Sequence, residues 1–131
     1  MQRRFLAMAG ALVASLLATS GSAQVTIGAT FTATGTNASI GIPGKNTMEV
    51  LPDTIGGQSI RLVVLDDGGD PSVAARNARK LATEERADVI IGSSSTPTCL
   101  ALADIVAVSH TPQLCLAPIP IRNPFVFSVP Q

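Results

Sequence analysis

The sequence of 131 residues contains no tryptophan, no tyrosine and only four phenylalanines. Aromatic side chains are the usual platforms on which bases stack, so their scarcity removes a common surface for nucleic acids or sugars. Charge is also sparse and balanced, with nine basic and nine acidic residues. A nucleic acid or an anionic membrane requires a basic patch. We therefore expect no nucleic-acid partner and no binding to an anionic membrane.

Residues that ligate metals are equally few, because the chain has one histidine and two cysteines. Asp66, Asp67 and Asp70 form an acidic cluster, but no glutamate follows at the spacing that a calcium loop requires. The pattern instead predicts that Asp70 caps a helix whose first residue is Pro71, with Asp66 and Asp67 as polar loop residues. We expect no metal site.

Residues 1–23 have the layout of a secretory signal peptide. Arg3 and Arg4 precede an apolar run over residues 5–18, and small residues lead to a cleavage site after Ala23. The apolar run is shorter than the roughly 20 residues that a membrane span needs. We favour export over a membrane anchor, with no membrane insertion after leader removal. Residues 24–131 then carry seven basic and nine acidic residues, a net charge of −2.

Export would place Cys99 and Cys115 where disulfides form. Free cysteine is nevertheless among the most buried residue types. We favour two small core residues over a disulfide, and the pairing stays open.

Short apolar runs alternate with helical patterns along residues 24–131. Strands are predicted at residues 25–30, 59–66, 89–91 and 113–116, and a further strand begins near residue 125. Helices are predicted at 38–51, with an irregular first turn, at 71–86 and from 96 to about 108. This alternation indicates an α/β fold, with a mostly parallel sheet and helices on both faces.

A turn of four polar residues stands between the third strand and its helix. Ser93, Ser94 and Ser95 follow Gly92, and Thr96 is the predicted N-cap before Pro97. Unsatisfied backbone N–H groups and hydroxyls would gather at the positive end of the helix dipole, which favours an anion such as a carboxylate. A flexible, self-capping loop remains an equal alternative. Ligands of such sheets bind at the carboxyl ends of the strands, where this turn and residues 34–37, 66–70 and 117–120 lie.

The signatures of enzymes with α/β folds are missing. The first strand is not followed by G-x-G-x-x-G, and the turn after the third lacks the Gly-Lys-Ser/Thr ending of a phosphate-binding loop. The sequence around Ser94 is not the G-x-S-x-G elbow of a hydrolase. His110 has no catalytic neighbour and is predicted to be a surface residue. We expect no catalytic residue, no cofactor and no enzymatic activity.

Three strings in order nevertheless have a recognisable pattern: TGTNASIGIPGKNTMEVLPDTIGG, RLVVLDDGGDPSVAARNARKLATEERADVIIGSSSTP and TPQLCLAP. Together they resemble the N-terminal lobe of periplasmic substrate-binding proteins of the branched-chain amino acid (leucine-binding protein-like) type, which serve ABC transporters. The resemblance implies the first lobe of a type I periplasmic binding protein, in the periplasm. Such a protein closes its two lobes on an amino acid or similar carboxylate and presents it to a membrane permease.

The resemblance also implies ligand-binding positions in two loops. The first supplies Ser94, Ser95 and Thr96, with Ser95 the strongest candidate, and the second supplies Ala117 and Ile119. Residues 117–120 have no hydroxyl and include two prolines, so an amide, a urea-like compound or an aromatic acid stays open as the ligand. Ile40 is a candidate for the apolar side of the cleft or for the core.

Family members are several hundred residues long and have a second lobe. We expect residues 24–131 to be an incomplete N-terminal lobe that binds ligand weakly or not at all alone. The alternatives are the sensing lobe of a receptor or amide/urea-type regulator, or a truncated product without function.

Overall fold

The computed structural model describes residues 24–129, so the expected signal peptide at residues 1–23 lies outside the described residues. Six strands and four helical segments follow one another along the chain. They are β1 (Gln24–Phe31), α2 (Ala38–Glu49), β2 (Thr54–Ile55), β3 (Gln58–Asp66), α3 (Pro71–Arg79), the π-helical turn η2 (Lys80–Glu84), β4 (Val89–Ile91), α4 (Thr96–Ser109), β5 (Gln113–Cys115) and β6 (Val126–Ser128).

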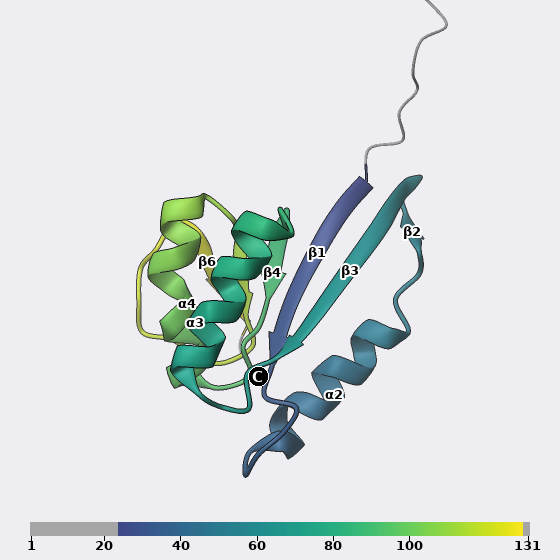
Figure 1. Ribbon diagram of the computed structural model, residues 1–131. Coiled ribbons are helices and arrows are strands. Elements are labelled where there is room, and N and C mark those ends of the chain that lie inside the picture. The colour runs from purple at the N-terminus through teal and green to yellow at the C-terminus, as the bar shows by residue number, and fades with distance from the viewer. Residues whose placement is uncertain (1–23, 130–131) are drawn as a thin grey trace, which may run out of the picture.

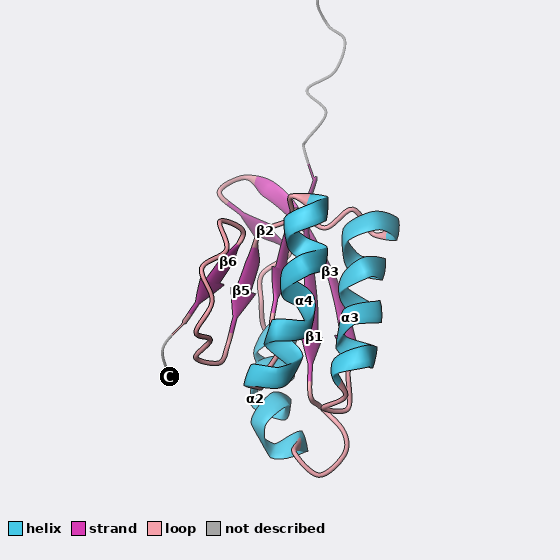
Figure 2. Ribbon diagram, turned by 90° about the vertical axis from the view of Figure 1, so that its left-hand side faces the viewer, coloured by secondary structure: helices cyan, strands magenta, loops and turns pink. Residues whose placement is uncertain are grey.

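The strands form one sheet in the order β2-β3-β1-β4-β5-β6, and every neighbouring pair is parallel except β2 with β3. Helices α3 and α4 pack side by side on one face of the sheet, and α2 covers the other (Figure 1; Figure 2). The predicted α/β fold, with a mostly parallel sheet and helices on both faces, is confirmed. Among residues 24–129, no helix is both long and apolar enough to cross a membrane.

The short strand β2 is a feature that the sequence reasoning missed, since no strand was predicted between the helix at 38–51 and the strand at 59–66. Gly56 and Gly57 both have positive φ angles, of 58° and 80°. Two such residues make the tight connection that joins antiparallel strands. They fold Thr54 and Ile55 back against the start of β3.

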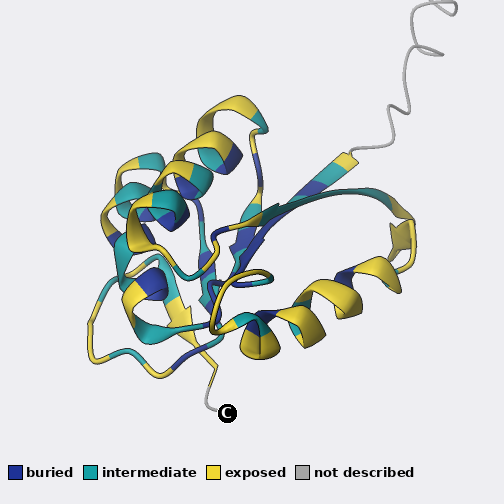
Figure 3. Ribbon diagram, turned by 60° about the horizontal axis from the view of Figure 1, so that its bottom comes forward, coloured by how far each residue is buried: buried dark blue, intermediate teal, exposed yellow. Residues whose placement is uncertain are grey.

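The larger hydrophobic core lies between the sheet and helices α3 and α4. Its fully buried side chains include Ala74 and Ala78 of α3 and Leu81 of η2, together with Ile90, Leu102 and Val106. A smaller cluster under α2 consists of Ala29, Phe31 and Met48. Much of α2 is therefore exposed, as the yellow ribbon in Figure 3 shows.

The first helix is continuous from residue 38, so the predicted irregular first turn is wrong. Pro43 lies inside it, and the hydroxyl of Thr47 donates to the Pro43 carbonyl at 2.8 Å. Gly41 allows the helix to approach β1, because a Cβ at this position would lie 2.1 Å from the carbonyl oxygen of Thr32. The contact brings the start of α2 against the carboxyl end of the sheet.

The second predicted helix begins as expected at Pro71, with Asp70 as its N-cap. The Asp70 carboxylate accepts hydrogen bonds from the backbone N–H groups of Ser72 at 2.6 Å and Val73 at 3.1 Å. The bond from Val73 has the largest effect, and together the two bonds hold the pKa of the Asp70 carboxyl below its ordinary value. The helix ends in the π-helical turn η2 and not as regular α-helix to residue 86.

Candidate functional site

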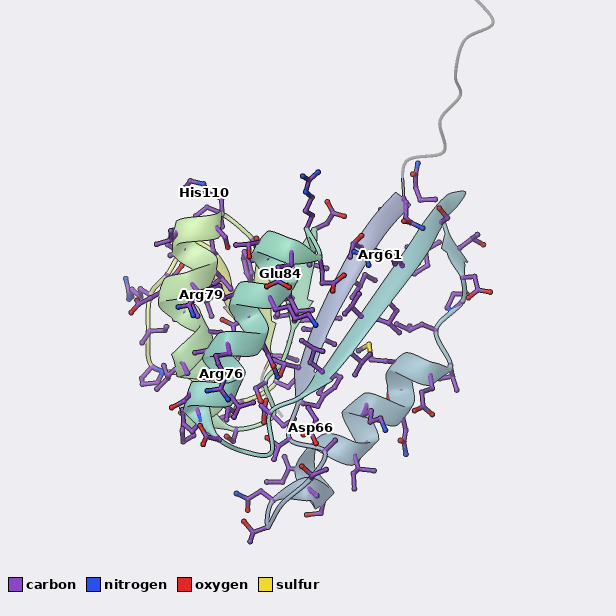
Figure 4. The ribbon with its side chains drawn as sticks, in the orientation of Figure 1. Arg61, Asp66, Arg76, Arg79, Glu84 and His110 are labelled. Carbon is purple, nitrogen blue, oxygen red and sulfur yellow. A yellow bond between two sulfur atoms is a disulfide. The ribbon has the colours of Figure 1, made fainter. Side chains whose placement is uncertain are left out.

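The carboxyl ends of the parallel strands meet at one edge of the sheet, at the bottom of Figure 1, where α2 also begins. Figure 4 shows Asp66 at this edge and His110 at the opposite end of α4. A cavity of about 210 Å³ opens here. Its lining residues come from α2, the serine turn (residues 93–96), the loop after β5 and the end of the described chain: Ile40, Pro43, Gly44, Ser94, Leu116 and Val129.

The serine turn starts from a backbone position that only glycine fits. Gly92 has a φ angle of 113°, and a Cβ at this residue would lie 2.0 Å from the carbonyl oxygen of Thr30 in β1. The turn therefore lies tightly against the neighbouring strand. Its first two serines, Ser93 and Ser94, are both buried.

Ser94 is the predicted site residue that the structure places in the cavity wall. Its Oγ accepts a hydrogen bond from the backbone N–H of Thr32 at 3.4 Å. Because this bond uses a lone pair, the hydroxyl proton of Ser94 is left to donate. The backbone N–H of Ser94 also has no hydrogen-bond partner within residues 24–129. This residue offers two donors at the carboxyl edge.

Ser95, not Thr96, is the N-cap of α4, so the predicted cap is wrong by one residue. The backbone N–H of Ser95 donates to Thr98 Oγ1 at 3.3 Å, and the two hydroxyl oxygens lie 2.7 Å apart. The N–H expected to be unsatisfied at this residue is therefore used within the protein. A hydroxyl three residues into the helix was the overlooked signal, because a residue there can reach back to the cap.

Thr96 connects the serine turn to the loop after β5. Its hydroxyl donates to the carbonyl oxygen of Pro118 at 3.0 Å. Since the single proton is committed, Thr96 Oγ1 has only lone pairs left to offer a ligand. A fixed acceptor therefore lies in the same turn as the two donors of Ser94.

Of the predicted site residues, Ser94 lines the cavity, whereas Ser95, Thr96, Ala117 and Ile119 do not. Ala117 is buried, its N–H lies 3.3 Å from Cys115 Sγ, and its carbonyl accepts from the hydroxyl of Ser128 at 2.8 Å. Ile119 packs on the cluster formed by Ala117 and the two cysteines. The structure thus brings the two predicted loops together but turns these two residues toward the core.

Cys99 and Cys115 form a disulfide, with their Cα atoms 5.8 Å apart. The preference for two unpaired core residues is therefore wrong, although both residues are fully buried as expected. The bond joins the first turn of α4 to the end of β5. The backbone N–H of Leu116 adds a hydrogen bond to the Ser93 carbonyl at 3.3 Å. Together with the Thr96–Pro118 contact, these links tie the serine turn to the following loop.

Asp67 is the residue at this edge whose burial the sequence reasoning missed. It was expected to be a polar loop residue, but it is buried and accepts hydrogen bonds from the hydroxyls of Thr30, Thr32 and Ser93. Its neighbour Asp66 is exposed. Partial burial of the Asp66 carboxyl raises its pKa. Hydrogen bonds, of which those from the Thr34 hydroxyl and the Gly68 N–H have the largest effect, outweigh the burial and hold the pKa of Asp66 below its ordinary value.

His110 is exposed at the end of α4, so the prediction of a surface histidine is confirmed. Its backbone is in the left-handed conformation, with a φ angle of 54°, and its ring centroid lies 5.2 Å from that of Phe125. In the described part of the chain, no three histidine, cysteine or acidic side chains gather as metal ligands would.

Solved structures of ligand-binding proteins are similar to this chain. An extracellular ligand-binding receptor from Rhodopseudomonas palustris HaA2 is 42% identical, with a TM-score of 0.78 over 83% of this chain and 31% of its own. A solute-binding protein of an ABC transporter from R. palustris BisB5, solved in complex with 3,4-dihydroxybenzoic acid, is 26% identical, with a TM-score of 0.74 over 80% and 31%. A leucine-binding protein from Thermotoga maritima MSB8 is 25% identical, with a TM-score of 0.72 over 80% and 32%.

The chain thus spans about a third of the length of these solved relatives. No curated protein matches its sequence. The family model described as periplasmic binding protein, however, matches residues 24–129, which is the whole described chain. Together with the α/β fold, this match shows that the chain belongs to the type I periplasmic binding protein family, as the sequence motifs indicated.

Proposed function

We propose that this chain is the ligand-binding N-terminal lobe of an ABC-transporter substrate-binding protein that takes branched-chain or related amino acids. The observation that carries the proposal is Ser94, whose hydroxyl is held as a donor in the wall of the cavity at the carboxyl edge. A carboxylate accepts hydrogen bonds and donates none, so it is complementary to this hydroxyl and to the Ser94 N–H. The chain does not act as an enzyme.

The ammonium group of an amino acid would need an acceptor. Residues 117–120 contain no hydroxyl, but the Pro118 carbonyl fixes the Thr96 hydroxyl so that only its lone pairs remain. In this proposal Thr96 Oγ1 accepts from the ammonium group. Ser95, Ala117 and Ile119 act by shaping the two loops, because their polar groups or side chains are engaged within the protein.

The remaining walls of the cavity are apolar and suit the hydrocarbon part of a ligand. Ile40, Pro43, Leu116 and Val129 line it together with Ser94. Binding sites for small molecules commonly combine such apolar walls with a few placed polar groups. A branched aliphatic side chain would lie against these residues while its carboxylate meets the serine turn.

An aromatic acid is a second candidate ligand. The missing hydroxyl in residues 117–120 weakens the case for an ammonium group, and the BisB5 relative was solved with 3,4-dihydroxybenzoic acid. Such a ligand would use the same Ser94 donors and would leave Thr96 as an acceptor for a ring hydroxyl. The two candidates differ in whether the acceptor meets an ammonium group or a hydroxyl.

In the cell, the proposed protein would be exported by residues 1–23, cleaved after Ala23 and delivered to a membrane permease from the periplasm. A sensing lobe of a receptor or of an amide-responsive regulator would have the same fold. Neighbouring genes for a permease and an ATPase would favour transport, whereas a kinase or regulator gene would favour sensing.

The proposal is tested by NMR titration of the 131-residue chain with leucine, isoleucine and 3,4-dihydroxybenzoate. Isoamylamine and catechol, which lack the carboxylate of leucine and of the aromatic acid, are the matched control ligands. We expect millimolar binding, because a chain a third as long as its solved relatives supplies only part of the contacts. A carboxylate should shift the Ser94 amide resonance and its control should not. Micromolar affinity would contradict the partial-site proposal, and equal shifts from acid and control would refute recognition of the carboxylate.

A further inference from the structure

Asp67, in the loop after β3, is a buried carboxylate with 1% of its surface exposed. Among residues 24–129, no cationic side chain forms an ion pair with it. Hydrogen bonds compensate for its burial instead. Three hydroxyls and the backbone N–H of Gly69, at 2.9 Å, donate to its two oxygens. A buried carboxylate without its donors is strongly unfavourable, so the positions of these donors are tightly specified.

One of the three hydroxyls belongs to the serine turn. Ser93 Oγ donates to Asp67 Oδ2 at 2.6 Å, within the range of short, strong hydrogen bonds to a carboxylate. Ser93 is fully buried and does not line the cavity. Its hydroxyl points inward, whereas that of the next residue, Ser94, lies in the cavity wall.

A second connection runs from Asp67 to Ser94 through Thr32. The Thr32 hydroxyl donates to Asp67 Oδ1 at 2.8 Å, and the Thr32 backbone N–H donates to Ser94 Oγ at 3.4 Å. The same carboxylate therefore fixes Ser93 directly and Ser94 through one intermediate residue. Both connections cross from the end of β1 or β3 to the turn after β4.

We propose that Asp67 is the positioning residue of the ligand site: its carboxylate holds Ser93 inward and thereby sets Ser94 in the cavity wall as a donor. Asp67 itself does not touch the ligand. That the serine turn is a ligand site rests on the proposed function. The position and the backbone order of the serine turn, however, can be measured without any ligand. Failure of the two proposals is therefore distinguishable.

The chain offers a matched pair of variants. Ser93→Ala and Thr30→Val each remove one hydroxyl that donates to Asp67 Oδ2, at 2.6 and 3.1 Å respectively. Only the first breaks the direct connection between Asp67 and the serine turn, and both leave the connection through Thr32 in place. Both variants leave the carboxylate short of one donor, so a general loss of stability should appear in both. Asp67→Asn serves as a second test, since its amide nitrogen accepts no hydrogen bond.

Backbone ¹⁵N relaxation of Ser94 and Ser95 is the readout. In Ser93→Ala the order parameters should fall from about 0.85, typical of rigid backbone, to below about 0.6, and in Thr30→Val they should stay near the first value. Asp67→Asn should behave as Ser93→Ala does. Unchanged order in Ser93→Ala, or equal loosening in Thr30→Val, would overturn the assignment.

Titration with leucine and 3,4-dihydroxybenzoate gives the second readout. The Ser94 amide response should be lost in Ser93→Ala and kept in Thr30→Val. If neither probe shifts this amide in the unmodified chain, the proposed function fails, and the relaxation data still decide whether Asp67 positions the turn. A full Ser94 response in a folded Ser93→Ala variant would also overturn the assignment.

Discussion

Reducing the Cys99–Cys115 disulfide is expected to lower the free energy of unfolding by about 3 kcal/mol. The two residues are 16 positions apart in sequence, and a cross-link closing a loop of about this length removes chain entropy worth roughly 3 kcal/mol from the unfolded state. For a small domain the denaturant dependence is about 1–3 kcal/mol per molar urea. The loss should therefore move the unfolding midpoint down by between about 1 and 3 M.

The assay is equilibrium unfolding in urea with and without a phosphine reductant, followed by circular dichroism. Both sulfurs are buried, so the samples need equilibration at each urea concentration until the signal is constant. The double variant Cys99→Ala/Cys115→Ala is the control. Its unfolding curve should lie at or below that of the reduced chain and should not respond to the reductant.

The reasoning would be refuted by a midpoint that reduction leaves unchanged while mass spectrometry shows two free thiols. Such a result would mean that residues 99–115 are already held together in the unfolded chain. A loss confined to the double variant would instead assign the effect to packing of the sulfur atoms.

Three further predictions concern the fold that carries the site. Leu81→Ala should destabilise the chain by about 2–5 kcal/mol in urea unfolding, because this side chain of η2 is fully buried in the larger core. Val108→Ala, at an exposed position of α4, should change stability by less than about 0.5 kcal/mol. Gly41→Ala should lower the free energy of unfolding by about 1–3 kcal/mol in the same assay, since the Cβ of the alanine would overlap the Thr32 carbonyl. An unchanged unfolding midpoint would contradict the close approach of α2 to the end of β1. NMR titration of the Asp70 carboxyl should give a pKa below its ordinary value of 3.8. The cap then contributes its full stability above pH 3.8 and loses it as the pH falls through the lower pKa of the folded chain. A pKa at or above 3.8 would contradict the cap.

The fold was predictable because its signals are local. Alternating apolar runs defined the parallel strands, and an N-cap before proline placed the start of α3. The exposed His110 followed from the absence of catalytic neighbours in the sequence. These features depend on residues a few positions apart, which a single sequence displays directly.

Two of the misses, Asp67 and the disulfide, have a different physical cause, because both depend on contacts between segments that are far apart in the sequence. Three hydroxyls converge on the buried Asp67, from Thr30 in β1, from Thr32 just after β1 and from Ser93 in the serine turn, and nothing in the surrounding DDGGD pattern encodes them. The disulfide depends on how β5 lies beside α4. The cap at Ser95 was accessible from the sequence, however, since Thr98 stands at the position that completes the motif.

The central claim is that Ser94 at the carboxyl edge recognises the carboxylate of a small molecule. It is tested most directly by NMR-detected affinity for leucine and 3,4-dihydroxybenzoate in the unmodified chain, in Ser94→Ala and in Val108→Ala, an exposed control outside the cavity. A hydrogen bond to a charged group is worth about 1.5–3 kcal/mol, so the account predicts that Ser94→Ala weakens binding at least about tenfold and that the control binds unchanged. Equal affinity in Ser94→Ala and the unmodified chain would contradict it.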